Sequence, residues 1–210
     1  APTLASVTPP LVAVSGGTGS LFGYGKQINR EAFVEMLRAL SGILGKRNLS
    51  VPDMRVDLVD EAVLEAVRDY TIGWVFFGLE SGSNDMLKAM KKGVTREDNL
   101  RAVELARRVG VKVGGSFIVG YPGESREDYM ESMSFLEQAM LDDVFVSIAE
   151  PIPGTPLARR ALDVPENELA LYQEHDGDFK ALRLSEAEAR CFELMLQGEG
   201  CKPVPRAITN

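Results

Sequence analysis

Three apolar stretches of this sequence end abruptly in glycine and polar residues, and this repeated form constrains the fold most. Residues 11–14 (LVAV) run into SGGTGS, residues 76–79 (FFGL) into ESGS, and residues 116–119 (SFIV) into GYPGE. Each stretch has the form of a buried strand with polar groups at its C-terminal tip. In barrels and open parallel sheets, the loops after such tips form the functional site. We therefore expect these tips to form the candidate site edge.

Between the apolar stretches, apolar residues recur with helical spacing. Phe33, Leu37, Leu40 and Leu44 follow one another at i, i+4, i+7 and i+11, and Gly45 stands where a helix stop belongs. Further helices are expected over residues 60–69, 84–90, 95–108 and 125–140, and strands over residues 11–14, 54–59, 72–79, 111–119 and 144–149. Strands that alternate with helices through short loops form right-handed parallel βα units.

The predicted fold class is therefore α/β, a partial TIM-type (βα) barrel with parallel strands and about five visible βα units. A chain of 210 residues is rather short for a complete eight-unit barrel. Beyond residue 160 the sequence becomes acidic and irregular, and one more amphipathic helix is expected from residue 185 to residue 197. We thus expect a barrel domain over residues 1–160 and a helical C-terminal extension over residues 161–210.

The composition excludes several function classes. The formal net charge of −8 at pH 7 argues against a broad nucleic-acid surface, which needs clustered lysine and arginine. Cys191 and Cys201 are the only cysteines and His175 is the only histidine, too few soft ligands for a zinc site or an iron–sulfur cluster held by this chain alone. Because we find no apolar run of roughly 18 residues and no secretory signal pattern, we expect a cytoplasmic protein without a membrane partner.

The residues at the three tips suit one kind of ligand. Residues 16–18 (GGT) offer backbone groups and a hydroxyl to an amine or a carboxylate, Glu80 and Ser81 offer acceptors to a ribose diol or an ammonium, and residues 118–120 offer an apolar edge to a flat base. Taken singly, a glycine-rich strand end is often a plain turn and a glutamate there is often a helix cap. Taken together, the tips suit a nucleoside joined to an amino acid.

The joint order of these motifs resembles the radical S-adenosylmethionine (radical SAM) superfamily, closest to the branch with methylthiotransferases, Elp3-like enzymes and cobalamin-binding members. The resemblance covers residues 11–160. It is carried by residues 16–18 (GGT) in place of the family's Gly-Gly-Glu, 55–57 (RVD), 78–83 (GLESGS), 92–95 (KGVT), 116–124 (SFIVGYPGE) and 151–157 (PIPGTPL).

The resemblance implies a set of cofactor contacts. The candidate S-adenosylmethionine-binding residues are Gly16, Gly17, Thr18, Arg55, Glu80, Ser81, Ile118 and Gly120. The first three would hold the methionine moiety, Glu80 and Ser81 the ribose or the amine, and the last two the adenine. Arg55 would bind a carboxylate or pair with Asp57 inside the barrel. We expect no catalytic residue and no metal ligand in this chain.

Two departures from the family pattern matter. The Cys-x-x-x-Cys-x-x-Cys loop that binds a [4Fe–4S] cluster is absent, and Thr18 stands where the family has a glutamate. Since the first recognisable strand corresponds to the family's second, we expect a fragment that lacks its first βα unit and is inactive alone. The intact enzyme would use an electron donor to cleave S-adenosylmethionine reductively to a 5′-deoxyadenosyl radical and act on an unknown substrate.

Two other interpretations stay open. One is a barrel that has lost the cluster and serves as a binding or interaction module, which Thr18 favours. The other is an ordinary barrel enzyme with Glu80 and Asp57 as acid and base. A barrel without its first unit would also expose the edge of a parallel sheet, and such edges promote association. We therefore expect this edge to be covered, by a homodimer or in another way, rather than a free monomer.

Overall fold

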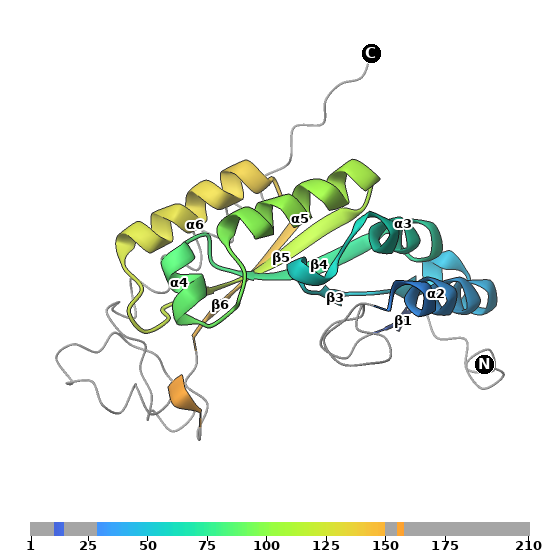
Figure 1. The fold of residues 1–210 in the computed structure, drawn as a ribbon, viewed down its shortest axis with the longest axis horizontal. Helices are drawn as coiled ribbons and strands as arrows, with labels where there is room; N and C mark the ends of the chain where they lie inside the picture. Colours follow the sequence, from blue (N-terminus) through green and yellow to red (C-terminus); the bar gives the residue numbers. More distant parts are fainter. Residues whose placement is uncertain (1–10, 15–28, 150–154, 158–210) are drawn as a thin grey trace, which may run out of the picture. The chain divides into compact units, whose positions relative to one another are not determined.

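The computed structural model describes residues 11–14, 29–149 and 155–157 (Figure 1). These residues belong to two compact units. Unit 1 comprises the described residues of Ala1–Gly78 and Glu97–Gly115, and unit 2 those of Leu79–Arg96 and Ser116–Asn210. The predicted glycine-rich tip at residues 16–18 and the predicted extension over residues 161–210 lie outside the described residues, so both stay predictions.

Helices and strands alternate along the described chain, as the sequence predicts. The elements are β1 (Val12–Ala13), α2 (Arg30–Leu44), η1 (Lys46–Asn48), β2 (Leu49–Ser50), β3 (Asp53–Met54), η2 (Val56–Leu58), α3 (Glu61–Tyr70), β4 (Trp74–Glu80), α4 (Asn84–Ala89), α5 (Arg96–Val109), β5 (Lys112–Val119), α6 (Arg126–Ala139) and β6 (Asp143–Ile148). β1 pairs with β2 in parallel, and β3 to β6 form a four-stranded sheet in the order β3-β4-β5-β6. β3 and β4 are also parallel. The predicted parallel-strand α/β class is confirmed.

The prediction of a strand over residues 54–59 is wrong beyond its first residue. β3 ends at Met54, and Val56–Leu58 is a turn of 3-10 helix. Within this turn, the Arg55 guanidinium donates two hydrogen bonds to the Asp57 carboxylate, at 2.9 and 2.8 Å. The two-residue strand β2 was not predicted.

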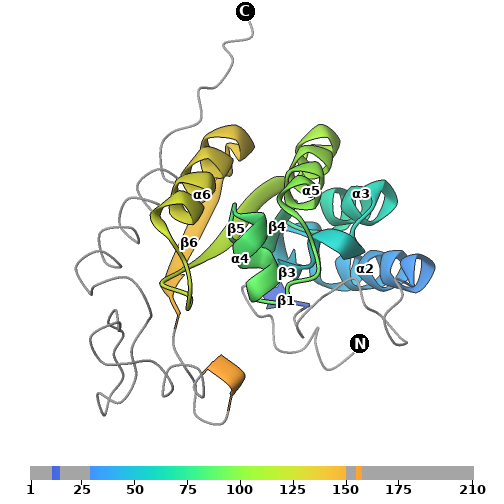
Figure 2. The ribbon, with the colours of Figure 1, turned by 60° about the vertical axis from the view of Figure 1, so that its left-hand side comes forward.

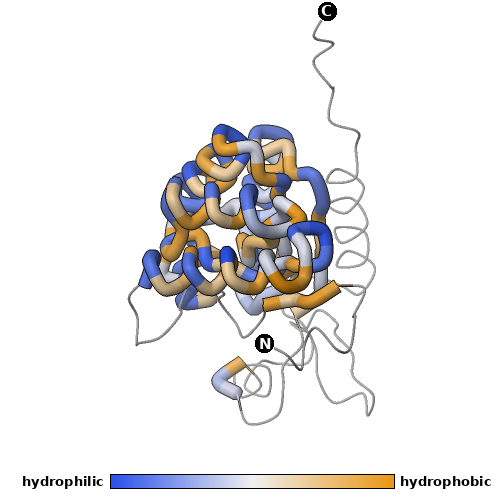
Figure 3. The backbone as a smooth tube through the Cα atoms, turned by 90° about the vertical axis from the view of Figure 1, so that its right-hand side faces the viewer, coloured by the Kyte–Doolittle hydropathy of each residue, from blue (hydrophilic) through white to orange (hydrophobic). Residues whose placement is uncertain are grey.

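Unit 1 places α2 beside α3 (Figure 1). The two helices bury apolar stripes at the expected spacing, with Phe33 and Leu37 on α2 and Leu64 on α3 fully buried. Asn29 and Asp60 cap the helix starts by accepting hydrogen bonds from backbone N–H groups. Figure 3 shows the matching alternation of hydrophilic and hydrophobic residues along the helices.

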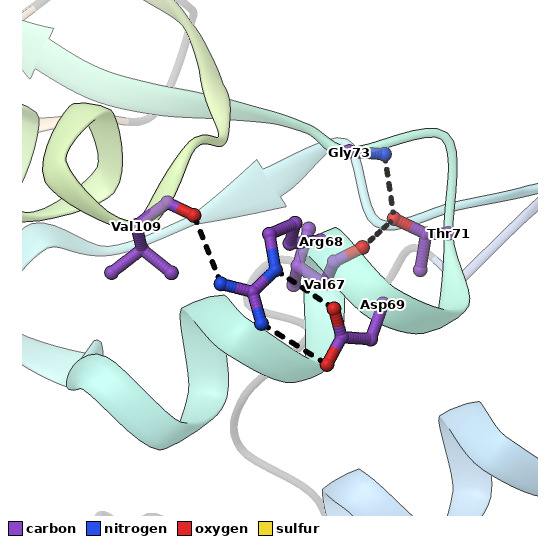
Figure 4. A network of polar contacts seen from close by, with 6 residues as sticks. All are labelled: Val67, Arg68, Asp69, Thr71, Gly73 and Val109. Carbon is purple, nitrogen blue, oxygen red and sulfur yellow. Dashed lines mark hydrogen bonds and ion pairs between the residues drawn. The ribbon is translucent and has the colours of Figure 1, made fainter.

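A polar network fixes the turn from α3 into β4 (Figure 4). The fully buried Thr71 hydroxyl donates to the Val67 carbonyl at 2.6 Å and accepts from the Gly73 N–H at 3.2 Å. The Arg68 guanidinium reaches the Val109 carbonyl at the end of α5, at 3.2 Å. Since these bonds satisfy backbone groups at two helix ends, they define where β4 begins.

Unit 2 packs α6 against the C-terminal half of β5 (Figure 2). The rings of Phe117 and Phe135 meet edge to face, with centroids 5.8 Å apart, and both residues are fully buried. β6 follows β5 in the sheet, where the Ala149 N–H donates to the Val119 carbonyl at 2.8 Å. The helix-facing sides of β5 and β6 are therefore closed by apolar contacts.

Candidate functional site

β4 ends in a strained turn at Glu80. The φ angle of Glu80 is 65°, in the left-handed region that residues other than glycine rarely adopt. The Ser81 N–H donates to the Leu79 carbonyl at 2.8 Å, which closes a three-residue γ-turn around Glu80. Backbone strain of this kind persists where the surroundings enforce it and is frequent at binding sites.

The Glu80 carboxylate is held by a lysine of the segment after α4. Lys92 Nζ lies 2.7 Å from Glu80 Oε1, and the two side chains are 20% and 18% exposed. Glu80 lies on the half-buried side of β4 with Phe76 and Gly78, whereas Leu79 faces the buried side. The tip of β4 thus presents an anion and a cation together, both accessible in part.

Ser81, Gly82 and Ser83 turn the other way and are buried against α6. The Ser81 hydroxyl, 1% exposed, lies 3.2 Å from the Ser132 hydroxyl and accepts from the Ser83 N–H at 3.1 Å. The hydroxyl therefore serves the protein's own packing. The sequence alone could not reveal this, because Ser132 is 51 residues away and carries no motif.

The loop after β5, residues 120–124, is held by hydrogen bonds to Glu124 within the loop. Ile118 is half-buried and alternates with the buried residues Phe117 and Val119, so it lies on the side of β5 opposite α6. Gly120 has a φ of 73°, and its N–H donates to a carboxylate oxygen of Glu124. The Glu124 N–H in turn donates to the Tyr121 carbonyl at 2.9 Å.

Glu124 is 1% exposed, and its environment shifts its protonation. Burial raises the pKa of Glu124 to about 7, and the nearby Asp128 carboxylate adds to the rise, while the backbone hydrogen bonds from Gly120 and Tyr121 oppose it. The carboxyl that holds the loop after β5 therefore titrates near neutral pH.

The other predicted site residues are placed as follows. Arg55 belongs to unit 1, where it pairs with Asp57 at 2.8 Å, with side chains 40% and 38% exposed. The sequence suggested this pairing as one of two roles, but inside the barrel, whereas both side chains are partly exposed. Gly16, Gly17 and Thr18 lie outside the described residues. Glu80, Ser81, Ile118 and Gly120 all belong to unit 2.

The described part of unit 2 offers groups of the kinds that S-adenosylmethionine would need. The cofactor is a zwitterion with a ribose and a flat base, and unit 2 offers the Glu80 carboxylate, the Lys92 ammonium and the apolar Ile118 on partly accessible surfaces. Lys92 was not among the predicted site residues. In the sequence, Lys92 was noted only as the first residue of the KGVT motif, and that motif does not predict a contact with Glu80.

An iron–sulfur cluster does not fit this chain. Three thiolate ligands are needed for the family's cluster, but the sequence holds two cysteines, Cys191 and Cys201, both outside the described residues. The described residues contain no group of three histidine, cysteine, aspartate or glutamate side chains that could hold a metal ion. Nor is any helix of the described part long and apolar enough to cross a membrane.

A model described as the radical SAM superfamily matches residues 11–136. This range includes the tips of β4 and β5 and the first turns of α6.

Comparisons with single proteins agree with this match. A relative from Methanocaldococcus jannaschii, named "Putative methylthiotransferase", is 57% identical over 94% of the chain and 44% of its own length. A tRNA-2-methylthio-N(6)-dimethylallyladenosine synthase of Clostridium novyi is 31% identical over 83% of the chain and 41% of its length. The chain thus spans less than half of either relative.

A solved structure shows the same fold. It is a radical S-adenosylmethionine methyltransferase from Kitasatospora setae with cobalamin and a [4Fe–4S] cluster bound, with a TM-score of 0.65 and 17% identity. The alignment covers 92% of this chain and 44% of that one.

Proposed function

Because the chain belongs to the radical SAM superfamily, we propose that it forms the S-adenosylmethionine-binding part of a methylthiotransferase. The observation that carries the proposal is the 57% identity over 94% of the chain to a relative with that name. The predicted resemblance to the branch with methylthiotransferases and cobalamin-binding members is confirmed. Membership of the superfamily implies S-adenosylmethionine and a [4Fe–4S] cluster as cofactors.

Each tip has a separate role in the proposal. Glu80 accepts hydrogen bonds from the ribose or the amine, and Lys92 sets the position of the Glu80 carboxylate and neutralises a carboxylate of the ligand. Ile118 and the backbone at Gly120 contact the adenine. The contacts of Gly16, Gly17 and Thr18 with the methionine moiety complete the set.

The structure supports different roles for two of the predicted contact residues. The buried Ser81 hydroxyl, already bonded to the protein, supports a role beneath the ligand better than a direct contact. Likewise, the pairing of Arg55 with Asp57 supports a structural role for Arg55.

The cofactor pair supplies the reductive chemistry when bound. Since the chain has two cysteines, the thiolates for the cluster come from outside these 210 residues. We therefore expect the 210 residues alone to leave S-adenosylmethionine intact. The acidic net charge of −8 supports the view that the main contacts to a nucleic-acid substrate lie outside these 210 residues. By analogy with the Clostridium novyi relative, the substrate class is an adenosine in tRNA.

The test uses the full-length protein with its cluster reconstituted. We expect formation of 5′-deoxyadenosine when S-adenosylmethionine and a reductant are added. Mass spectrometry of tRNA nucleosides should also show a methylthio nucleoside that is lost when the gene is deleted. Cleavage of S-adenosylmethionine without any methylthio product would contradict the proposed methylthio transfer but not the assignment to the superfamily.

A binding module without a cluster is the second candidate, favoured by Thr18 in place of the family's glutamate. A hydroxyl there supplies no charge to the cofactor's amine. If the full-length protein binds S-adenosylmethionine but shows no absorbance near the iron–sulfur bands after reconstitution, the binding module is correct and the enzyme proposal fails.

A further inference from the structure

The loop after Glu80 is built onto the backbone of α6. A Cβ atom added to Gly82 would lie 2.6 Å from the Glu131 carbonyl oxygen and 2.6 Å from the Ser132 Cα. Only glycine allows this approach, because real side chains do not come so close to a helix backbone. The Gly82 N–H donates to the Ser132 hydroxyl at 2.9 Å, and that hydroxyl donates to the Asp128 carbonyl at 3.3 Å.

Asp128 ties the same loop to the start of α6. The Ser83 hydroxyl donates to Asp128 Oδ1 at 2.6 Å. The other carboxylate oxygen of Asp128 accepts from the Ser125 N–H and hydroxyl, at 2.9 and 2.7 Å, as part of a capping box. Ser83 also caps α4 by accepting from the Met86 N–H. One carboxylate therefore joins the start of α6 to the loop that follows the tip of β4.

The same carboxylate lies next to the loop after β5. Glu124, which accepts a hydrogen bond from the Gly120 N–H, directly precedes the Ser125 cap in the chain, and the nearby Asp128 carboxylate raises the pKa of Glu124 by like-charge repulsion. A second link runs from the Tyr121 hydroxyl to the Ala89 carbonyl at the end of α4, at 3.3 Å. The tip expected to bind the ribose or the amine and the tip expected to bind the adenine are thus joined through the start of α6.

We propose that Asp128 and Ser132 are positioning residues for S-adenosylmethionine. By fixing residues 81–83 on α6, they hold Glu80 in its left-handed turn and at a set position relative to the Gly120 loop. Neither residue contacts the cofactor. The inference rests on the proposed function, because it assumes that these two tips bind S-adenosylmethionine.

The test measures the dissociation constant for S-adenosylmethionine and the melting temperature of the full-length protein. Asp128→Ala should raise the dissociation constant about tenfold, the effect of losing one charge-assisted hydrogen bond that orders a binding loop. Ser132→Ala and Ser83→Ala are milder variants that keep the test informative if Asp128→Ala does not fold. Ser83→Thr retains the hydroxyl and should restore most of the affinity.

Asp60→Ala is the matched control. Asp60 also caps a helix, accepting from the Val63 N–H at 3.0 Å, but it belongs to α3 in unit 1. It should lower the melting temperature without raising the dissociation constant more than about twofold. Equal dissociation constants for the two variants, or wild-type affinity in Asp128→Ala, would overturn the inference. If the wild-type protein itself does not bind S-adenosylmethionine, the proposed function fails instead.

Discussion

Glu80 combines a strained backbone with a paired side chain, which is a costly arrangement for an ordinary strand end. Its φ of 65° and its 2.7 Å contact with Lys92 both place the carboxylate at the tip of β4. Glycine would adopt this turn at lower cost but would leave the tip without an acceptor. A glutamate at this strained position is therefore what a ligand-binding tip requires.

The strain itself is measurable. Glu80→Ala should be roughly 1 kcal/mol less stable than Glu80→Gly, because both lose the Lys92 contact but only alanine resists the left-handed backbone. Urea unfolding of the two variants gives the difference. Asp143 is the control position, because its φ is not positive. There the order of stability should reverse, and Asp143→Ala should be more stable than Asp143→Gly. Equal stability of the two Glu80 variants would show that the turn is not strained.

Glu124 predicts a pH dependence. Its pKa rises from 4.5 in the unfolded chain to about 7 in the fold, so the folded state binds more protons between these values. The stabilising contribution is complete below pH 4.5 and is lost as the pH rises through 7, with a total of roughly 3 kcal/mol.

Glu124→Gln tests this dependence, since the amide keeps an acceptor for the Gly120 N–H but does not titrate. Denaturation midpoints at pH 5, 6, 7 and 8 should fall more steeply for the wild type than for the variant. Parallel curves would mean that Glu124 is already ionised throughout this range.

At the scale of elements, local signals in the sequence predicted the helices well. The helix expected from residue 125 begins with a capping box of Ser125 and Asp128, and the helix expected from residue 60 is capped by Asp60. The strand predicted over residues 54–59 was wrong because alternation of apolar and polar residues did not reveal the 3-10 turn at Val56–Leu58.

The parts of the candidate site that escaped prediction depend on contacts between distant residues. The positions of Glu80, Ile118 and Gly120 at strand tips follow from their motifs. The direction of the Ser81 hydroxyl follows from Ser132, which lies on another element. No local pattern encodes such a pairing.

Gly114 tests the packing of β4 against β5. A Cβ atom at Gly114 would lie 2.4 Å from Cδ2 of the Phe76 ring. Gly114→Ala should therefore cost about 2 kcal/mol through overpacking, and Phe76→Leu in the same chain should recover part of this loss. Thermal unfolding of the two single variants and the double variant measures the coupling.

Gly42→Ala is the control for that experiment, since no atom lies within 4 Å of a Cβ at that position in α2. It should stabilise the protein by about 0.5–1 kcal/mol, the usual gain for alanine in a helix. Additive effects of Gly114→Ala and Phe76→Leu would show that the ring does not fill the space above Gly114.

At the scale of the whole molecule, the sheet suggests self-association. β6 is the last strand in the described order, and Phe145 on it is 59% exposed. Because large exposed apolar side chains promote association, we expect the 210-residue chain to sediment as a dimer and Phe145→Lys to shift it toward monomer. Met130→Lys, at an equally exposed position on α6, should leave the dimer unchanged. A monomeric wild type would refute the prediction.

The central claim is that the tip of β4 binds S-adenosylmethionine through Glu80. The most direct measurement is calorimetric titration of the cofactor into the reconstituted full-length protein carrying Glu80→Gln, with Glu104→Gln on the exposed side of α5 as control. We predict that Glu80→Gln raises the dissociation constant about tenfold, by loss of a charge-assisted hydrogen bond, while the control matches wild type. Wild-type affinity and undiminished cofactor cleavage in Glu80→Gln would contradict the claim.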